Sequence, residues 1–333
     1  MAIRTALMSL VLAVLLLAQG CIIVPLSGLG GTAAYEEVTL RDGRYGAGKI
    51  LVLDVDGAIT GGPDSSGFFS SGSTVVEVTE KLGKAREDDR IRAVVLRVDS
   101  PGGGVTASDV IYKELLKYKE ETGVPIYTSM LDLAASGGYY IAMASDEIYA
   151  HPTTVTGSIG VIAMFPQMKG LGDKLGVGFE VIKSGANKDI GGFWKQMSPE
   201  ERAIMQSIID DMYGNFVEIV GKNRTDLDEA TIRKLADGRV YTASQAYDAG
   251  LVDGIMYLDE VIDHAANQYK EGSKPTVVLY RKTSNRTAES FYVKAPAAVP
   301  ASAGVQTQLN LLNVSGAGPQ APKSEVFQYL WVP

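Results

Sequence analysis

The sequence has few of the residues that common catalytic and metal sites require. Its 333 residues include one cysteine, Cys21, and two histidines, His151 and His264. A lone cysteine cannot form a disulfide within the chain, and so few cysteines and histidines nearly exclude a zinc site. A Ser-His-Asp triad would have to use one of the two histidines. We therefore expect neither a metal ion nor a cofactor.

Excess basic charge is also missing, because the formal net charge is −8. Binding to nucleic-acid phosphates needs a concentrated basic face, so we expect no nucleic-acid partner. Long apolar runs are equally scarce. The run over residues 6–18 is shorter than the roughly 20 residues of a membrane-spanning helix.

That apolar run nevertheless predicts export. It follows Arg4 and precedes Ala-Gln-Gly-Cys at residues 18–21, which resembles a bacterial lipobox whose cysteine is lipidated and becomes the mature N-terminus. We expect a lipoprotein signal peptide over residues 1–20, and an anchor with a linker over 21–48. The alternative is an uncleaved anchor that extends through Leu26. Both place the body at the bacterial cell membrane, on its extracytoplasmic side.

The body alternates between strand and helix patterns. Apolar runs predict strands at residues 50–56, 93–98, 125–130, 148–150 and 179–182, and apolar spacing predicts helices at 74–89, 107–122 and 136–144. Capping boxes at residues 198–201 and 242–245 predict two later helices. This alternation predicts one α/β domain with a mostly parallel sheet over residues 49–270.

The last part of the chain has a different composition. Residues 271–333 are rich in Pro, Ala, Gly and Ser and end in an apolar tip that contains Tyr329, Leu330 and Trp331. We expect an extended tail. Its tip either docks in a groove of its own or a neighbouring subunit, or is disordered.

The strongest candidate for chemistry is a serine between small residues. Residues 134–140 read Ala-Ala-Ser-Gly-Gly-Tyr-Tyr and place Ser136 at a predicted strand-to-helix turn. A nucleophile needs such open space, and free N–H groups at a helix start can hold an oxyanion. The alternative is an ordinary serine cap with glycines for close packing.

Three further motifs are weak when each is taken alone. Residues 101–104, Pro-Gly-Gly-Gly, can supply an oxyanion N–H or form a flexible turn; the Lys-Ser/Thr ending of a phosphate loop is missing. Residues 156–161 form a turn with two hydroxyls. Residues 183–190 contain two lysines. A lysine can replace histidine as a general base where burial lowers its pKa, but these patterns alone select no particular lysine.

Together these motifs, followed by Ala-Asp-Gly-Arg-Val-Tyr at residues 236–241, resemble the signal peptide peptidase A (protease IV) family of Ser–Lys serine peptidases, in its short single-unit form. The resemblance covers roughly residues 49–270. It implies that Ser136 is the nucleophile, Lys188 the general base and Ser158 the residue that orients this lysine. It further implies that Gly103 and Gly137 donate the N–H groups of the oxyanion hole.

The same resemblance implies a Clp-protease/crotonase-like ββα superhelix and a homo-oligomeric ring of about eight subunits, in which a neighbour can supply the lysine. Remnant signal peptides or other membrane-associated peptides are the expected substrates. Two alternatives share the fold: a crotonase-like acyl-thioester enzyme and a non-catalytic membrane scaffold. The export signal argues against the first.

Overall fold

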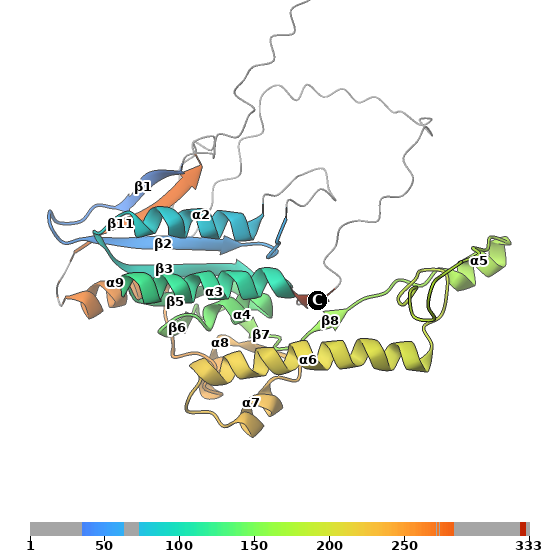
Figure 1. Ribbon diagram of the computed structural model, residues 1–333. Coiled ribbons are helices and arrows are strands. Elements are labelled where there is room, and N and C mark those ends of the chain that lie inside the picture. The colour runs from blue at the N-terminus through green and yellow to red at the C-terminus, as the bar shows by residue number, and fades with distance from the viewer. Residues whose placement is uncertain (1–34, 63–72, 271, 273, 283–326, 331–333) are drawn as a thin grey trace, which may run out of the picture.

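The computed structural model describes residues 35–62, 73–270, 272, 274–282 and 327–330. Cys21, the expected lipobox and the signal peptide lie outside these ranges. The described chain folds around a twisted central sheet, with helices packed on both of its faces (Figure 1). Within these ranges no helix is both long and apolar enough to cross a bilayer.

The central sheet has nine strands among the described residues, and most of its pairs are parallel. Its main order is β1-β11-β2-β3-β5-β6-β10, and β7 pairs with both β5 and β9. The strands are β1 (Tyr35–Arg41), β2 (Lys49–Asp56), β3 (Ile91–Ser100), β5 (Ile126–Ala135), β6 (Glu147–Ala150), β7 (Val155–Gly157), β9 (Val240–Thr242), β10 (Gly254–Ile255) and β11 (Thr276–Lys282). The α/β class with a mostly parallel sheet, expected from the sequence, is confirmed.

A second, small sheet lies at the end of the central one. It contains three strands in the order β4-β12-β8, namely β4 (Gly102–Gly104), β12 (Phe327–Leu330) and β8 (Ile162–Ala163). Both pairs are antiparallel. The last described residues of the chain therefore pair with segments far from them in sequence.

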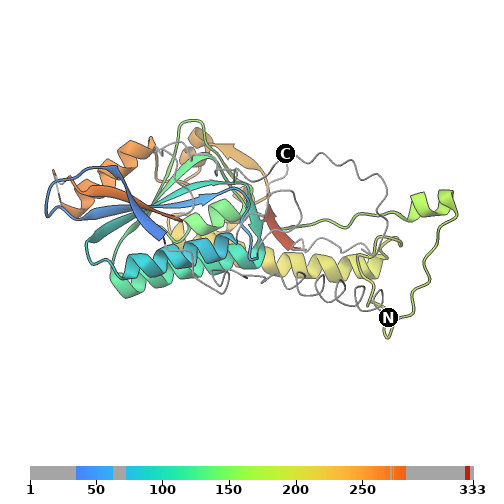
Figure 2. The same cartoon turned by 90° about the horizontal axis from the view of Figure 1, so that it is seen from above.

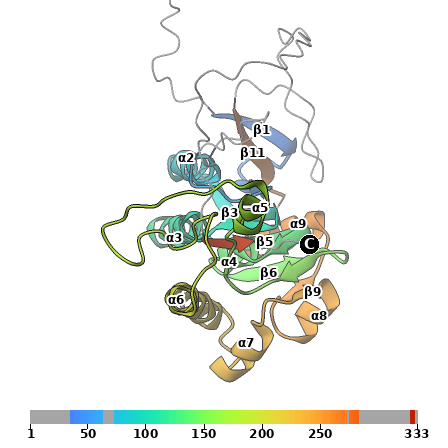
Figure 3. The same ribbon diagram turned by 90° about the vertical axis from the view of Figure 1, so that its right-hand side faces the viewer.

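Helices follow the strands and cover the sheet. They are α2 (Thr74–Arg86), α3 (Val105–Thr122), α4 (Gly137–Ala142), α5 (Lys169–Leu175), α6 (Pro199–Asn223), α7 (Glu229–Leu235), α8 (Ala243–Asp248) and α9 (Leu258–Tyr269). In Figure 3, α2 and α3 lie on one side of the sheet and α9 on the other. The capping boxes expected at Ser198 and Thr242 are both present.

The alternation of strand side chains explains this layering. Leu51 and Leu53 belong to the core cluster that includes residues of α2 and α3. Ile50 and Val52 belong to a separate cluster with α9. Successive side chains of a strand point to opposite faces, so the continuous apolar run of β2 fits a strand that is buried on both sides.

Three expectations need correction. Residues 179–182, predicted as a strand, are irregular and exposed; they have no neighbouring strand to pair with in the described chain, although their apolar run is of strand length. The expected linker contains β1, and the expected tail contains β11. These two strands pair with each other, and β11 also pairs with β2. Each is stabilised by hydrogen bonds and packing with segments far away in the sequence, and the local sequence pattern does not show these contacts.

An arm leaves the body between β8 and α6. It carries α5 and returns to the start of α6 (Figures 1 and 2). The far end of α6 is fixed to the body by Arg224, a buried residue whose guanidinium binds both carboxylate oxygens of Asp253 at 3.0 Å. Asp253 also accepts a hydrogen bond from the Ile148 N–H of β6 at 2.7 Å.

This anchoring predicts the effect of removing the carboxylate. In Asp253→Ala, the guanidinium of Arg224 stays buried without its carboxylate partner and keeps, among the described residues, only its hydrogen bond to Asn223, so the free energy of unfolding should fall by about 2–3 kcal/mol. Glu218→Ala is the matched control, because its ion pair with Lys222 is solvent-exposed and should contribute little. Chemical denaturation measures both variants. Equal stability of the two would contradict the anchoring role of Arg224.

Candidate active site

Ser136 occupies a strained turn between β5 and α4. Its backbone angles are φ 53° and ψ −113°, and its side chain makes no capping hydrogen bond to α4. Such angles cost a non-glycine residue about 1–3 kcal/mol and persist only where the surroundings enforce them. Two hydrogen bonds fix the turn: the Ser136 N–H donates to the Gly157 carbonyl at 2.7 Å, and the Tyr140 N–H donates to the Ser136 carbonyl at 2.8 Å.

Two positions near this serine, Gly137 and Gly103, have no room for a side chain. A Cβ on Gly137 would lie 2.5 Å from the Ser108 Oγ and 3.1 Å from the Gly103 nitrogen. A Cβ on Gly103 would lie 2.0 Å from the Ile59 carbonyl oxygen. The two glycines expected as oxyanion donors are therefore neighbours in space, next to the serine. A nearby pair of backbone N–H groups at a helix start can stabilise a developing oxyanion.

Ser158 lies at the equivalent point of the adjacent strand. In the pairing of β5 with β7, Ala135 is opposite Gly157, so each serine directly follows one member of this pair. Ser158 is also largely buried and has a positive φ of 49°. Its N–H donates to the Arg239 carbonyl at 2.7 Å. The structure thus brings Ser136, Ser158, Gly103 and Gly137 to one end of the sheet.

Lys188 is not part of this cluster within one chain. It is exposed, in the segment between α5 and α6 that belongs to the arm. Figure 2 shows how far this arm extends from the sheet. Lys188 is therefore present in the expected motif at residues 183–190, but the fold of a single subunit does not bring it close to Ser136.

The segment around Lys188 is held by an ion-pair network. Asp189 accepts hydrogen bonds from Lys183 at 2.6 Å and from Lys195 at 2.7 Å. These bonds lower the pKa of the Asp189 carboxyl to about 2. Lys195 also binds Glu201 at the start of α6. The network gives this otherwise irregular segment a defined shape.

The arm exposes many large apolar side chains. Ile182 is 96% exposed, Leu175 67% and Phe179 59%. The other exposed members are Met164, Met168, Leu171, Val177, Val181, Phe193 and Trp194. So many exposed apolar side chains on one projecting segment are typical of an interaction site.

The histidines serve other contacts. His264 on α9 lies 2.6 Å from the Glu147 carboxylate, at the start of β6, which is the opposite end of the parallel strands from Ser136. His151 contacts the Thr153 hydroxyl at 2.8 Å.

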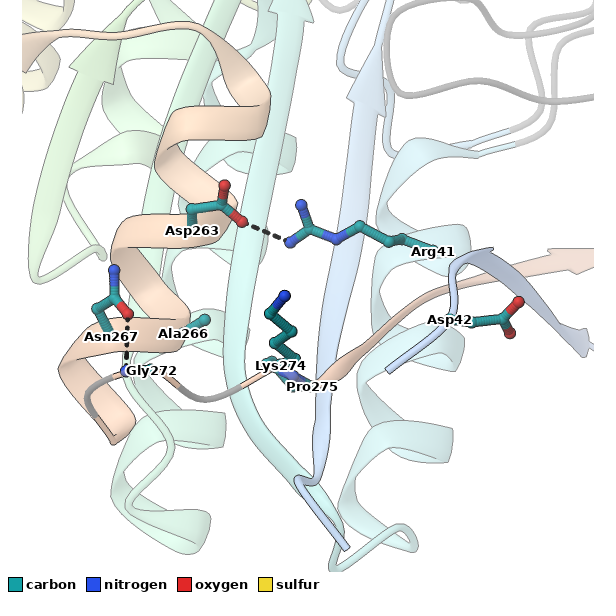
Figure 4. Close-up of a pocket in the computed structure, with 8 residues that line it drawn as sticks. All are labelled: Arg41, Asp42, Asp263, Ala266, Asn267, Gly272, Lys274 and Pro275. Carbon is teal, nitrogen blue, oxygen red and sulfur yellow. Dashed lines mark hydrogen bonds and ion pairs between the residues drawn. The ribbon is translucent and has the colours of Figure 1, made fainter. Parts of the chain in front are cut away.

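A pocket of about 450 Å³ lies at the end of the sheet opposite Ser136, and its lining includes Arg41, Asp263 and Lys274 (Figure 4). The Arg41–Asp263 ion pair spans it.

For the apolar tip of the tail, the sequence left docking and disorder open and did not indicate where the tip would dock. The edges of β4 and β8 border a slot at the serine end of the sheet, and β12 lies between them. Strands of two or three residues are too short to show a period in the sequence, and glycines in β4 carry no side-chain pattern. The available signal was a glycine run directly after a buried strand, and taken alone that run favours a flexible turn.

Comparison with known proteins agrees with this geometry. The model of the family described as peptidase family S49 matches residues 118–271, a range that includes Ser136, Ser158 and Lys188. A signal peptide peptidase SppA of Enterococcus faecium is 38% identical over 78% of this chain and 75% of its own length. A protease of Synechocystis sp. is 41% identical over 62% of this chain and 69% of its own.

Longer and more distant proteins also match. Protease 4 of Haemophilus influenzae is 37% identical over 65% of this chain, which corresponds to 34% of that protein. Among solved structures, a membrane-bound stomatin-specific protease aligns with a TM-score of 0.40 and 16% identity, covering 65% of this chain and 84% of that one. On the strength of the two relatives that this chain covers over most of their length, it belongs to peptidase family S49 and is a serine peptidase.

Proposed function

We propose that this protein is a membrane-anchored serine endopeptidase that degrades remnant signal peptides or other membrane-associated peptides with a Ser–Lys dyad. The observation that carries the proposal is the strained turn of Ser136 beside the N–H groups of Gly103 and Gly137. Membership of a peptidase family favours peptide hydrolysis over the acyl-thioester and scaffold alternatives.

In the proposed reaction, the Ser136 hydroxyl attacks a peptide carbonyl while the neutral Lys188 amine takes its proton. The Gly103 and Gly137 N–H groups hold the oxyanion. The lysine then gives the proton to the departing amine, and an acyl-enzyme remains. Water, deprotonated by the same lysine, hydrolyses the ester and restores the serine. Ser158 is proposed to accept or donate a hydrogen bond that orients the amine.

We propose that the lysine comes from a second copy of the chain. Lys188 is exposed on the arm, and the arm displays an apolar surface that one subunit does not cover. Docking this surface on a neighbour would remove water from around the lysine and disfavour its ammonium form. A contact between unlike surfaces, repeated around an axis, closes into a ring, which is the assembly that the family resemblance implies.

The tether is proposed to be lipid attached to Cys21. A lipid anchor keeps the catalytic body at the membrane surface, where peptides remain after secretion, and two or more acyl chains make such binding stable. This proposal rests on the N-terminal sequence alone, since those residues lie outside the described part of the structure.

The dyad predicts that two single substitutions abolish activity. Ser136→Ala and Lys188→Ala should each lower kcat for a fluorogenic apolar peptide by at least about 10³-fold, with the thermal unfolding midpoint unchanged. Ser184→Ala and Lys174→Ala change the same residue types on the exposed arm and should keep activity. A fully active Lys188→Ala would remove the dyad, and turnover of an acyl-CoA by the unaltered enzyme, with no peptide cleavage, would favour the thioester reading.

A shared site predicts complementation between the two inactive variants. Ser136→Ala and Lys188→Ala chains are co-expressed with different affinity tags, and mixed oligomers are isolated through both tags. In a randomly mixed ring, about a quarter of the sites combine an intact serine with an intact neighbouring lysine, so a comparable fraction of activity should return. Mixed oligomers without activity would show that the lysine does not come from a neighbour.

The proposed lipidation of Cys21 predicts where the Cys21→Ser variant is found in the cell. Cys21→Ser should move from the membrane fraction to the soluble extracytoplasmic fraction, and mass spectrometry of the unaltered protein should find acyl chains on Cys21. A Cys21→Ser protein that stays in the membrane fraction would instead favour the uncleaved apolar anchor.

A further inference from the structure

The hydroxyl of Ser100 joins two segments of the chain next to the proposed oxyanion donors. Ser100 is the last residue of β3 and is fully buried. Its Oγ donates a hydrogen bond to the Gly57 carbonyl at 2.6 Å and accepts one from the Gly102 N–H at 3.1 Å. Because a backbone carbonyl can only accept and an N–H can only donate, the direction of both bonds is fixed.

Two hydrogen bonds hold the peptide planes on either side of Gly102. The plane before it contains the Gly102 N–H, which is bound by Ser100. The plane after it contains the Gly102 carbonyl, which accepts a hydrogen bond from the Ile59 N–H at 2.9 Å. Between these planes Gly102 has a φ of 96°, a value that residues with a side chain rarely adopt. The two bonds therefore stabilise one conformation of a residue to which many are open.

The conformation of Gly102 determines where the Gly103 N–H points. The two residues share a planar trans peptide, in which the carbonyl and the N–H point in opposite directions. Since the Gly102 carbonyl points to Ile59, the Gly103 N–H points away from Ile59. A Cβ on Gly137 would lie 3.1 Å from the Gly103 nitrogen. This nitrogen therefore lies at the start of α4, beside Ser136.

Ser100 also packs against the helix that follows Ser136. A Cβ on Gly138, in the first turn of α4, would lie 2.8 Å from the Ser100 carbonyl oxygen and 3.5 Å from the Ser100 Cβ. In the pairing of β3 with β5, Ser100 is opposite Ala134, two residues before Ser136. One buried residue thus adjoins the Gly57 turn, the glycine strand β4 and the start of α4.

We propose that Ser100 is a positioning residue for peptide hydrolysis, whose hydroxyl acts through Gly102 to hold the Gly103 N–H in the orientation that stabilises the oxyanion. Ser100 touches neither substrate nor reacting atoms, because it is fully buried. This role rests on the peptidase reaction proposed above, in which Gly103 is an oxyanion donor. Misplacing a preorganised group by about 1 Å can cost about 10²-fold in rate, so a residue that fixes its position has a measurable effect.

A kinetic experiment compares Ser100→Ala with Ser145→Ala. Ser145 is also buried, and its hydroxyl is bonded to Thr128 at 2.6 Å, toward the opposite end of the sheet. For a fluorogenic peptide, kcat should fall about 10- to 100-fold in Ser100→Ala with KM unchanged, whereas Ser145→Ala should keep kcat. Thermal unfolding should show a loss of stability in both, because each loses a buried hydrogen bond. Equal kcat in the two variants would overturn the proposal.

Two inhibitors separate positioning from a general structural effect. A peptide aldehyde adds the Ser136 hydroxyl across its carbonyl, and the resulting oxygen occupies the oxyanion site; the corresponding peptide alcohol cannot form this adduct. In Ser100→Ala, the inhibition constant of the aldehyde should rise at least about tenfold, and that of the alcohol should stay the same. A parallel rise of both would indicate a general disturbance of the site and would count against positioning.

A second variant covers the case in which Ser100→Ala does not fold. Ser100→Cys keeps nearly the same side-chain size, but a thiol is a weak donor and a weak acceptor. Its kcat should therefore fall as well, with KM unchanged. Full activity of a folded Ser100→Cys enzyme would contradict the role of the hydroxyl.

Hydrogen exchange tests the positioning without relying on catalysis. Mass spectrometry follows exchange at the amides of residues 102–104, which should become faster in Ser100→Ala or Ser100→Cys and stay unchanged in Ser145→Ala. Unchanged exchange in every variant would show that the Ser100 hydroxyl does not hold this segment. If the unaltered enzyme cleaves no peptide, the proposed function fails, while the exchange rates still decide whether Ser100 fixes the glycine strand.

Discussion

The turn at Ser136 is the constraint on which the site depends. Its backbone angles are unfavourable for a residue with a side chain, and they are maintained by a hydrogen bond from the serine N–H to the Gly157 carbonyl on the adjacent strand. The pairing of β5 with β7 therefore does two things: it holds Ser136 in a strained position, and it brings Ser158 alongside. Because several strands meet there, the strain is supported by the whole sheet.

The same end of the sheet combines close packing with an open strand edge. Gly103 packs closely against the backbone of Ile59 on one side. Its own N–H and C=O groups face the opposite edge of β4. A side chain at this position would break the contact with Ile59 and shift the edge that β12 uses. Under the proposed mechanism, oxyanion binding would thus depend on this short glycine strand and on its contact with Ile59.

Under the proposed function, assembly would complete the active site. A lysine base needs a site shielded from water, whereas Lys188 is exposed on the isolated subunit. An unassembled chain would then hold a nucleophile without its base. Activity would then depend on the association of subunits.

Much of the fold was predictable because it is local. Runs of apolar residues gave the positions of β2, β3 and β5, and the capping boxes gave the starts of α6 and α8. The strand predicted at residues 179–182 was wrong, since an apolar run indicates a strand only when a partner edge is available. Strands β1 and β11 were missed for the converse reason: their pairing joins the two ends of the domain.

For the site, the sequence by itself determined which residue types stand at each turn, and hence that Ser136 lies between small residues at the start of a helix. Only the tertiary structure decided that Gly103 adjoins Gly137, that Lys188 lies on an arm away from the serine, and that β12, the last described strand, pairs with β4. The physical reason is the range of the forces involved. Turn and helix preferences act between near neighbours in the chain, whereas packing and strand pairing join residues far apart in sequence, and their outcome depends on the whole fold.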